Sequence, residues 1–299
     1  MVSLYPWIKA VRLRTLPLSL ASIVMAGFLA ATVPGFNLNV VIMAGITTLF
    51  LQILSNLAND YGDSRSGVDN PNRLGPKRTV QTGEISPSAM KKAMALLVVL
   101  SLISGLILIF LAASLPLKGT IAFLVFGASA IVAAITYTVG KKPYGYIGLG
   151  DLFVFIFFGL LGVKGTWYLA TQTFEPLVIL PSAAMGLLSA GVINLNNMRD
   201  MVSDQQSGKV TVASKIGMRK AFYYQCLLVL LPFVLLSAYV FLAGAPTRVF
   251  LIYLLLPFYL TDLRNLRHTF EGEWIDPLLS KLSVKILFLT IMFGVLLNW

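Results

Sequence analysis

Two segments of the chain carry carboxylate and amide side chains at a spacing that could hold a metal ion. The first Asp motif contains Asn59, Asp60 and Asp63, and the second contains Asp200 and Asp204. Residues four apart lie on one face of a helix, so Asn59 and Asp63 share a face, as do Asp200 and Asp204. Clustered carboxylates repel one another, and their oxygens favour a hard cation such as Mg²⁺ or Ca²⁺. The sequence therefore predicts two metal-binding motifs, although one alone could simply cap or solvate a helix end.

A third polar cluster, residues 137–151, combines lysines with tyrosines. Lys141 could bind phosphate oxygens, and the rings of Tyr137, Tyr144 and Tyr146 could face a cationic intermediate. The same composition is common in a positively charged loop with tyrosines at the membrane interface. The residues alone leave both interpretations open.

These clusters interrupt a chain that is far more apolar than a soluble domain. Of its 299 residues, 57% are hydrophobic and 12% are charged, whereas soluble domains are about half apolar and a quarter charged. Stretches near the length of about 20 residues that crosses a bilayer recur nine times, at 16–33, 38–56, 91–113, 119–139, 147–170, 176–198, 220–242, 246–262 and 281–298. We expect an all-α polytopic membrane protein, with about nine transmembrane helices in one bundle and a single domain over 1–299.

Lys and Arg are distributed very unevenly between the two ends of these helices. If the N-terminus is cytoplasmic, 20 of the 23 Lys and Arg fall on the cytoplasmic side, Lys118 and Arg248 fall outside, and Lys164 lies within a span. Cytoplasmic loops are enriched in Lys and Arg. This predicts a multi-pass protein of the inner (plasma) membrane with its C-terminus on the opposite face. Both Asp motifs fall on the cytoplasmic side, so we expect an Asp-lined cavity there.

Charge and composition exclude several other classes of function. A net charge of +11 would suggest nucleic acid in a soluble protein. Here loops facing anionic headgroups explain the charge better, so we expect the lipid bilayer and no nucleic acid as a partner. One cysteine, Cys226, excludes an intrachain disulfide and a multi-cysteine metal site. One histidine, His268, argues against a histidine-rich metal site.

Nine spans with Asp motifs after the second and the sixth resemble the UbiA superfamily of intramembrane aromatic prenyltransferases. The family's first motif, Asn-Asp-x-x-Asp-x-x-x-Asp, begins here at Asn59, and Gly67 replaces its last Asp, with Asp69 two residues later. The second motif, Asp-x-x-x-Asp, is intact from Asp200 to Asp204. Within the superfamily, the menaquinone branch of 1,4-dihydroxy-2-naphthoate polyprenyltransferases is similar to the stretches NLANDYGDSRSGVDNPNRLGPKR, AAITYTVGKKPYGYIGLGD and NLNNMRDMVSDQQSGKVTVASKIG.

The resemblance implies transfer of a polyprenyl group from polyprenyl diphosphate to 1,4-dihydroxy-2-naphthoate, with decarboxylation, giving demethylmenaquinol and diphosphate. It implies Mg²⁺ as cofactor, held by Asn59, Asp63, Asp200 and Asp204. The implied catalytic residues are Asp60, Asp63, Asp200 and Asp204. Candidates for direct contact with the diphosphate are Arg73, Arg78, Lys141 and Lys209, and candidates for the cation pocket are Tyr137, Tyr144 and Tyr146. The sequence does not place the group that binds the acceptor carboxylate, for which Arg12 and Arg14 are candidates.

Other functions remain open at this stage. Among enzymes, the alternative is a related prenyltransferase acting on 4-hydroxybenzoate or haem. A secondary transporter would also have many spans, but its acidic residues would more often lie near the bilayer midplane. A lipid-binding or assembly protein without catalytic activity would not need two metal motifs. The sequence gives neither the prenyl length nor the oligomeric state.

Overall fold

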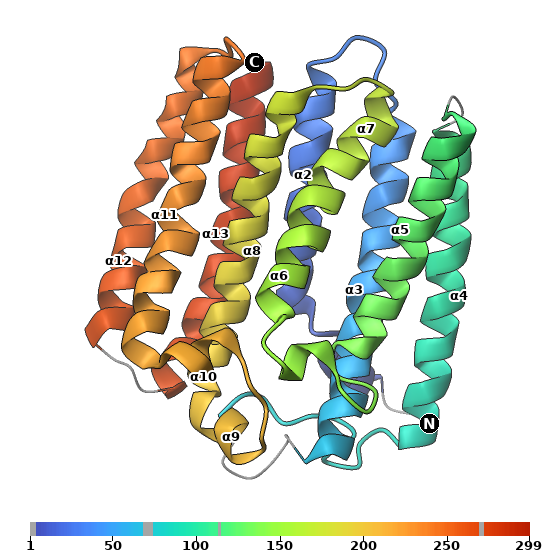
Figure 1. The fold of residues 1–299 in the computed structure, drawn as a ribbon, viewed down its shortest axis with the longest axis vertical. Helices are drawn as coiled ribbons and strands as arrows, with labels where there is room; N and C mark the ends of the chain where they lie inside the picture. Colours follow the sequence, from blue (N-terminus) through green and yellow to red (C-terminus); the bar gives the residue numbers. More distant parts are fainter. Residues whose placement is uncertain (1–3, 68–73, 113–114, 269–271) are drawn as a thin grey trace.

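The computed structural model describes residues 4–67, 74–112, 115–268 and 272–299 of the chain. Within these residues the secondary structure is helical and contains no β-strand; one isolated bridge joins Ile147 to Val210. The helices stand side by side in one elongated bundle (Figure 1). The N- and C-termini lie at opposite ends of the bundle, as expected for a chain that crosses a membrane an odd number of times.

Nine helical segments in the described residues are long and apolar enough to cross a membrane, as the sequence predicted. The first joins α1 (Tyr5–Val11), η1 (Leu13–Thr15) and α2 (Leu16–Ala31). The next three are α3 (Leu38–Ser66), α4 (Pro87–Leu111) and α5 (Leu117–Thr136). The fifth joins α6 (Gly150–Val154), the π-helix η3 (Phe155–Gly165) and α7 (Thr166–Thr171). The last four are η4–α8 (Pro176–Val178, Ile179–Arg199), α11 (Met218–Leu242), η5–α12 (Thr247–Leu255, Leu256–His268) and α13 (Gly272–Asn298).

Several helices extend beyond the apolar stretches that predict them. α3 was expected to end near residue 56 and continues to Ser66, so the first Asp motif lies within the helix. The eighth segment continues past residue 262 to His268, and α13 begins before residue 281. The physical reason is that hydropathy follows only the part of a helix that crosses the hydrocarbon, whereas polar helical turns continue into the interface.

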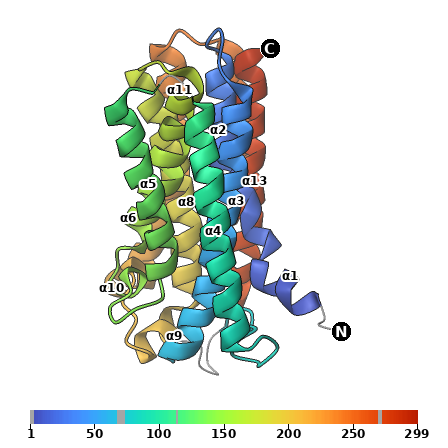
Figure 2. The same ribbon diagram turned by 90° about the vertical axis from the view of Figure 1, so that its right-hand side faces the viewer.

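The short elements gather at the end of the bundle that carries the N-terminus. They are η2 (Tyr144–Tyr146), α9 (Met201–Gln206) and α10 (Val212–Ile216). Figure 2 shows α1 projecting from the side of the bundle at this same end. Both Asp motifs therefore reach one end of the molecule, where loops can bring their side chains together.

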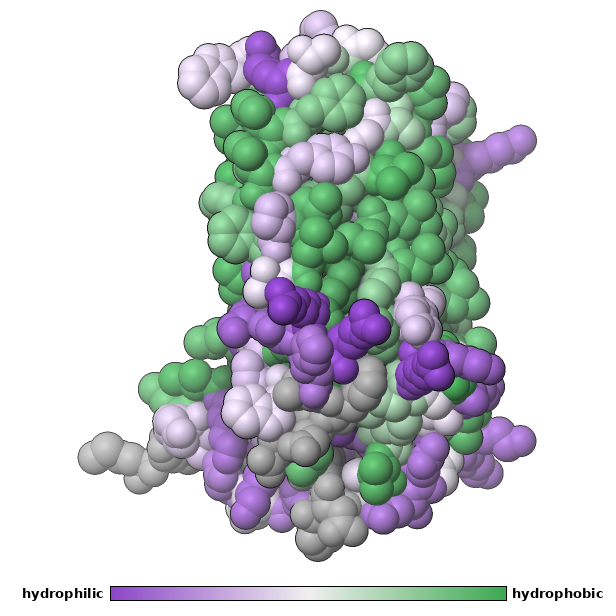
Figure 3. Space-filling view, turned by 90° about the vertical axis from the view of Figure 1, so that its left-hand side faces the viewer, coloured by the Kyte–Doolittle hydropathy of each residue, from purple (hydrophilic) through white to green (hydrophobic). Residues whose placement is uncertain are grey.

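The bundle has a buried interior and an apolar exterior. Met25 of α2, Met185 of α8 and Phe233 of α11 are at most 2% exposed within the larger core, and Leu54 and Met90 belong to a smaller core between α3 and α4. Figure 3 shows a broad hydrophobic band above a hydrophilic end of the molecule. An exterior of this kind is suited to lipid rather than water. The protein is a multi-pass membrane protein.

Candidate active site

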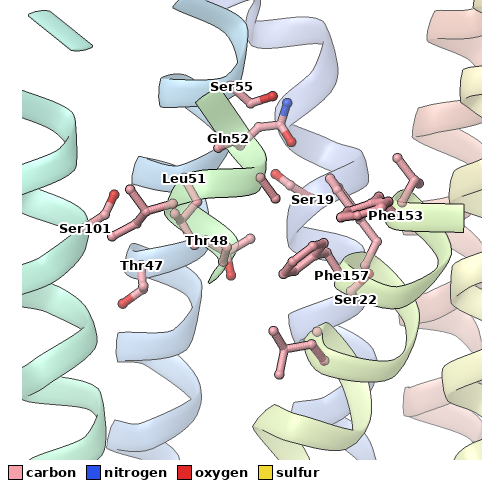
Figure 4. A pocket seen from close by; sticks show the side chains of 18 of the residues that line it. Ser19, Ser22, Thr47, Thr48, Leu51, Gln52, Ser55, Ser101, Phe153 and Phe157 are labelled. Carbon is pink, nitrogen blue, oxygen red and sulfur yellow. The ribbon is translucent and has the colours of Figure 1, made fainter. Parts of the chain in front are cut away.

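A cavity of about 400 Å³ lies inside the bundle and reaches its motif-bearing end. Helices α2, α3, α4, α5, α8 and α13 and the α6–η3–α7 segment all contribute side chains to it. Its polar end is lined by Asn59 and Asp63 of α3, by Tyr137, and by two cations from loops, Arg78 and Lys209. Figure 4 shows part of the interior, where Thr47, Thr48 and Ser55 of α3 lie across from Phe153 and Phe157, and Ser19 and Ser22 of α2 lie beside these two rings.

Asp63 is the acidic residue of the first Asp motif that faces this cavity. Its Oδ2 accepts a hydrogen bond from Arg78 Nη2 at 2.5 Å, and its Oδ1 accepts one from the Tyr146 hydroxyl at 2.5 Å. The carboxylate is 4% exposed. A buried charge is stable only when it is paired and hydrogen-bonded, and both of these conditions are met here.

Asp60 lies on another side of α3 and does not line the cavity. Its Oδ2 accepts hydrogen bonds from the backbone N–H of Thr79 at 3.0 Å and from the Thr79 hydroxyl at 2.8 Å, and its Oδ1 accepts one from Val80 N–H at 3.1 Å. The residue that precedes Thr79 is Arg78. Asp60 therefore fixes the loop that carries the cationic partner of Asp63.

Two glycines shape the end of α3 around this motif. A Cβ on Gly62 would lie 2.6 Å from the carbonyl oxygen of Thr138, so only glycine allows this close approach. Thr138 in turn donates from its hydroxyl to Ala58 O at 3.0 Å and to Asn59 Oδ1 at 3.2 Å. Gly67, at the family's third Asp position, ends α3 with φ 77° and ψ 5°. An Asp in this left-handed conformation would be strained, and it would not continue the helix face.

The second Asp motif spans a break between two helices. Asp200 is both the residue that follows α8 and the residue that precedes α9. The backbone N–H of Asp204 still donates to Asp200 O at 2.8 Å, so the two residues remain one turn apart, as predicted. Arg199 binds both oxygens of Asp200, through Nε at 2.9 Å and Nη2 at 2.6 Å. Its Nη1 also donates to Asp276 Oδ1 at 2.5 Å.

Asp204 is paired with Lys209, which lines the cavity. Its carboxylate lies 3.1 Å from Lys209 Nζ, and the two side chains are 1% and 9% exposed. Burial raises the pKa of Asp204 to about 6, against the opposing effect of Lys209. The charges of Asp200 and Asp63 contribute to the same rise in pKa. The two motifs, which are far apart in sequence, are linked through Tyr146, whose hydroxyl binds Asp63 and whose ring lies under Lys209, the partner of Asp204.

The tyrosines of the third cluster divide between two roles. Tyr137 and Tyr144 line the cavity in an edge-on pair with ring centroids 5.3 Å apart. Tyr144 also stacks on Phe153 at 4.2 Å. Tyr146 is absent from the described lining; its hydroxyl binds Asp63 and its ring lies 5.8 Å below Lys209 Nζ. A backbone hydrogen bond from Val210 N–H to Tyr146 O at 3.0 Å joins these two loops.

The two remaining predicted cations are Lys141 and Arg73. Lys141 is exposed on the loop and lies outside the described cavity lining. Arg73 lies outside the described residues. Sequence reasoning also missed Arg199 and Asp276. The position of Arg199 beside the second Asp motif could have drawn attention to it, whereas Asp276 stands 77 residues away with no local signal.

The donor atoms at this end of the bundle suit a magnesium ion bound together with a diphosphate. Among the described residues, no three His, Cys, Asp or Glu side chains gather closely enough to hold a metal by themselves. Mg²⁺ is commonly bound by one or two carboxylates, with water and substrate phosphates completing its shell. Asn59 and Asp63 offer oxygen donors on the cavity wall, next to cations that can contact phosphate. Asp200 and Asp204 lie outside the described lining, where Arg199 and Lys209 pair with them.

Comparison with known proteins agrees with this arrangement. The family model described as "UbiA prenyltransferase family" matches residues 20–273. The chain is 48% identical over 223 residues to 1,4-dihydroxy-2-naphthoate octaprenyltransferase of Escherichia coli (strain K12), covering 74% of this chain and 72% of the relative. It is 40% identical over 290 residues to the protein of the same name from Haemophilus influenzae, covering 96% and 94%.

Solved structures show the same fold. A UbiA homolog from Archaeoglobus fulgidus bound to DMAPP and Mg²⁺ superposes with a TM-score of 0.64 at 17% identity, over 98% of this chain and 99% of that chain. The match to the family model covers most of the chain, and the relatives exceed 30% identity over more than two thirds of it. The chain therefore belongs to the UbiA prenyltransferase family.

Proposed function

We propose that the protein transfers a polyprenyl group from a polyprenyl diphosphate to 1,4-dihydroxy-2-naphthoate. In this reaction a C–O bond to diphosphate breaks and a C–C bond to the ring forms. The ring carboxylate leaves as CO₂ with its bonding electrons retained by the ring, giving demethylmenaquinol. Relatives of that name at 40% and 48% identity support the choice of acceptor. The observation that carries the proposal is the link between the two Asp motifs at one end of the cavity, where the Tyr146 hydroxyl binds Asp63 and the Tyr146 ring lies under Lys209, the partner of Asp204.

Mg²⁺ is the proposed cofactor, held by Asn59, Asp63, Asp200 and Asp204. When bound, it neutralises the negative charge that develops on the departing diphosphate. The homologous structure with DMAPP and Mg²⁺ supports this assignment. We assign Asp60 a positioning role instead, because all of its observed hydrogen bonds go to Thr79 and Val80.

Arg78 and Lys209 are the proposed diphosphate contacts. Both line the cavity, and both pair with carboxylates of the motifs, Arg78 with Asp63 and Lys209 with Asp204. A guanidinium and an ammonium group donate strong, charge-assisted hydrogen bonds to phosphate oxygens. Binding of the diphosphate would give each cation a second anionic partner. Arg73 stays a prediction from the sequence.

The aromatic side of the cavity is the proposed site of the allylic cation. Tyr137, Tyr144, Phe153 and Phe157 all line it. Ring faces stabilise a cation, and an apolar wall shields the cation from capture by water. Tyr146 is better assigned to holding Asp63, because its hydroxyl binds that carboxylate at 2.5 Å.

The isoprenoid tail is proposed to leave the cavity through its lipid-facing side. Leu102 and Leu106 of α4 and Leu124 of α5 line the cavity and are 47%, 56% and 42% exposed. Apolar side chains this exposed on a cavity wall suit a place where the cavity opens toward the bilayer. A tail longer than the cavity can therefore extend into lipid.

The motif-bearing end is proposed to face the cytoplasm, in the inner membrane. The distribution of Lys and Arg supports this orientation. Val202 is 67% exposed at that end and Phe174 is 74% exposed between the fifth and sixth spans. After replacement of Cys226 by Ala, a membrane-impermeant maleimide should label Val202→Cys only in opened vesicles and Phe174→Cys in intact cells. The reverse pattern would invert the proposed topology.

A product assay tests the reaction itself. Membranes containing the protein would receive Mg²⁺, a polyprenyl diphosphate and either 1,4-dihydroxy-2-naphthoate or 4-hydroxybenzoate, and the lipid extract would be analysed by mass spectrometry. We expect a product of demethylmenaquinone mass with the naphthoate alone, abolished by EDTA. A product formed only from 4-hydroxybenzoate would contradict the proposed acceptor.

A further inference from the structure

The cavity has two chemically different walls. Figure 4 shows Gln52 and Ser55 of α3 on one side of the space and Phe153 and Phe157 on the other, with Ser19 of α2 beside Phe153. An isoprenoid chain offers no hydrogen bonds, and leaving buried polar groups without partners is costly. The aromatic wall suits the isoprenoid. The polar wall suits a second ligand that carries polar groups of its own.

The chain segment at the edge of the polar wall is held in an unusual conformation. Arg12 adopts φ 55° and ψ 64°, in the left-handed region that residues with a side chain avoid. Its carbonyl oxygen accepts hydrogen bonds from the N–H and the hydroxyl of Thr15, both at 2.9 Å. Asn56 Nδ2 pins the same turn to α3 through Val11 O at 2.8 Å and the Thr15 hydroxyl at 3.0 Å. Strain that the surroundings maintain in this way is typical of functional sites.

The turn brings two arginines, Arg12 and Arg14, to the cavity. Arg14 Nη1 donates to Asp276 Oδ2 at 3.3 Å, and the other oxygen of Asp276 accepts from Arg199. Asp276 thus orients Arg14 while sharing its charge with a second arginine. A guanidinium group has five N–H donors, and this ion pair uses a single one of them on Arg14.

Positive charge exceeds negative charge on the described cavity lining. Its four cations are Arg12, Arg14, Arg78 and Lys209, and its one acid is Asp63. Arg78 and Lys209 pair with carboxylates of the Asp motifs, where the diphosphate is proposed to bind. Arg12 and Arg14 come from a different element, beside the polar wall. Their charge fits a second anionic group, distinct from the diphosphate.

We infer that Arg12 and Arg14 form the subsite for the carboxylate of the aromatic acceptor. This inference rests on the proposed function, which supplies an acceptor with a ring carboxylate. The planar guanidinium fork matches a carboxylate in two parallel hydrogen bonds. Gln52 and Ser55 stand on the same wall for the ring hydroxyls. The acceptor ring then lies between this wall and the aromatic wall, beside the allylic carbon.

A binding comparison tests the subsite without turnover. The purified full-length protein would be titrated with 1-hydroxy-2-naphthoate and with 1-naphthol, which lacks the carboxylate. The wild type should bind the acid more tightly than 1-naphthol. Arg14→Gln should reduce this preference by about 10- to 100-fold, and its affinity for 1-naphthol should stay within about twofold of that of the wild type. Arg14→Lys keeps the charge without the fork and should lose less. Arg219→Gln, an exposed arginine at the start of α11, is the matched control and should behave as the wild type.

Two results would overturn the subsite. One is an equal loss of affinity for both ligands in Arg14→Gln, which would make Arg14 a purely structural partner of Asp276. The other is a raised KM for the polyprenyl diphosphate with an unchanged KM for the naphthoate. A wild type that prefers the acid but forms no prenylated naphthoate would support the subsite and contradict the proposed function, so the two failures are distinguishable.

Discussion

The first Asp motif lies within a continuous helix, whereas the second spans the break between α8 and α9. The arginines that pair with the carboxylates of the two motifs also differ in position. Arg78, which pairs with Asp63, comes from a loop and lines the cavity. Arg199, which pairs with Asp200, lies outside the described lining and is also bound to Asp276. Each motif therefore has one cation on the cavity wall, Arg78 for the first and Lys209 for the second, and the second motif has a further cation, Arg199, that is placed for structure.

The largest effect should separate these two arginines. Arg78→Met should lower kcat/KM by about 100- to 1000-fold, because a group facing the leaving diphosphate is lost. Arg199→Met should instead lower the free energy of unfolding by about 3–5 kcal/mol, because it leaves the buried Asp200 without its cation. Steady-state kinetics and thermal unfolding in detergent would measure both quantities. A large rise in the KM for the polyprenyl diphosphate, with unchanged stability, in Arg199→Met would contradict this distinction between the two arginines.

A smaller effect should show that Asp60 acts through Arg78. Asp60→Asn weakens three hydrogen bonds to the Thr79–Val80 loop, and we expect a loss of about 10- to 100-fold in kcat/KM, as for residues that orient a ligand. The double variant with Arg78→Met should be little worse than Arg78→Met alone, since coupled residues are not additive. Fully additive losses would show that Asp60 contacts the reacting groups directly.

Part of this arrangement can be predicted from the sequence, and part depends on the folded structure. The nine spans and the meeting of both motifs at one end follow from hydropathy and charge, because those patterns reflect the bilayer directly. Helical spacing says that Asn59 and Asp63 share a face but not which face meets the cavity. The direction of Asp60, toward Thr79 and Val80, and the role of Asp276 depend on partners that are distant in the sequence. Likewise, a tyrosine at position 146 does not by itself indicate whether its ring or its hydroxyl group contacts the Asp motif.

Close packing at the first motif gives a more modest prediction. Gly62→Ala would place a Cβ 2.6 Å from Thr138 O, and the required shift should lower the free energy of unfolding by about 1–3 kcal/mol. Gly105→Ala on α4 is the control, since a Cβ there meets nothing within 4 Å. Thermal unfolding would compare the two variants. Equal stability of both would show that α3 and the Thr138 loop adjust freely.

The smallest effect should come from the exposed lysine of the third cluster. Lys141→Gln should change kcat/KM by no more than about twofold, as for most surface substitutions, because the side chain is exposed and outside the cavity lining. Lys209→Gln, which removes a cavity-lining cation, should lower kcat/KM by more than about tenfold. A strong loss in Lys141→Gln would mean that its loop closes onto the substrate.

The central claim is that both motifs hold one metal–diphosphate unit while Asp60 only positions the loop. Binding of Mn²⁺ in place of Mg²⁺, followed by electron paramagnetic resonance with an unreactive prenyl thiodiphosphate present, tests this directly. We predict that Asp63→Asn and Asp200→Asn each weaken Mn²⁺ binding by at least about tenfold and that Asp60→Asn leaves it within about twofold. Unchanged binding in Asp200→Asn, or a loss in Asp60→Asn equal to that in Asp63→Asn, would contradict the claim.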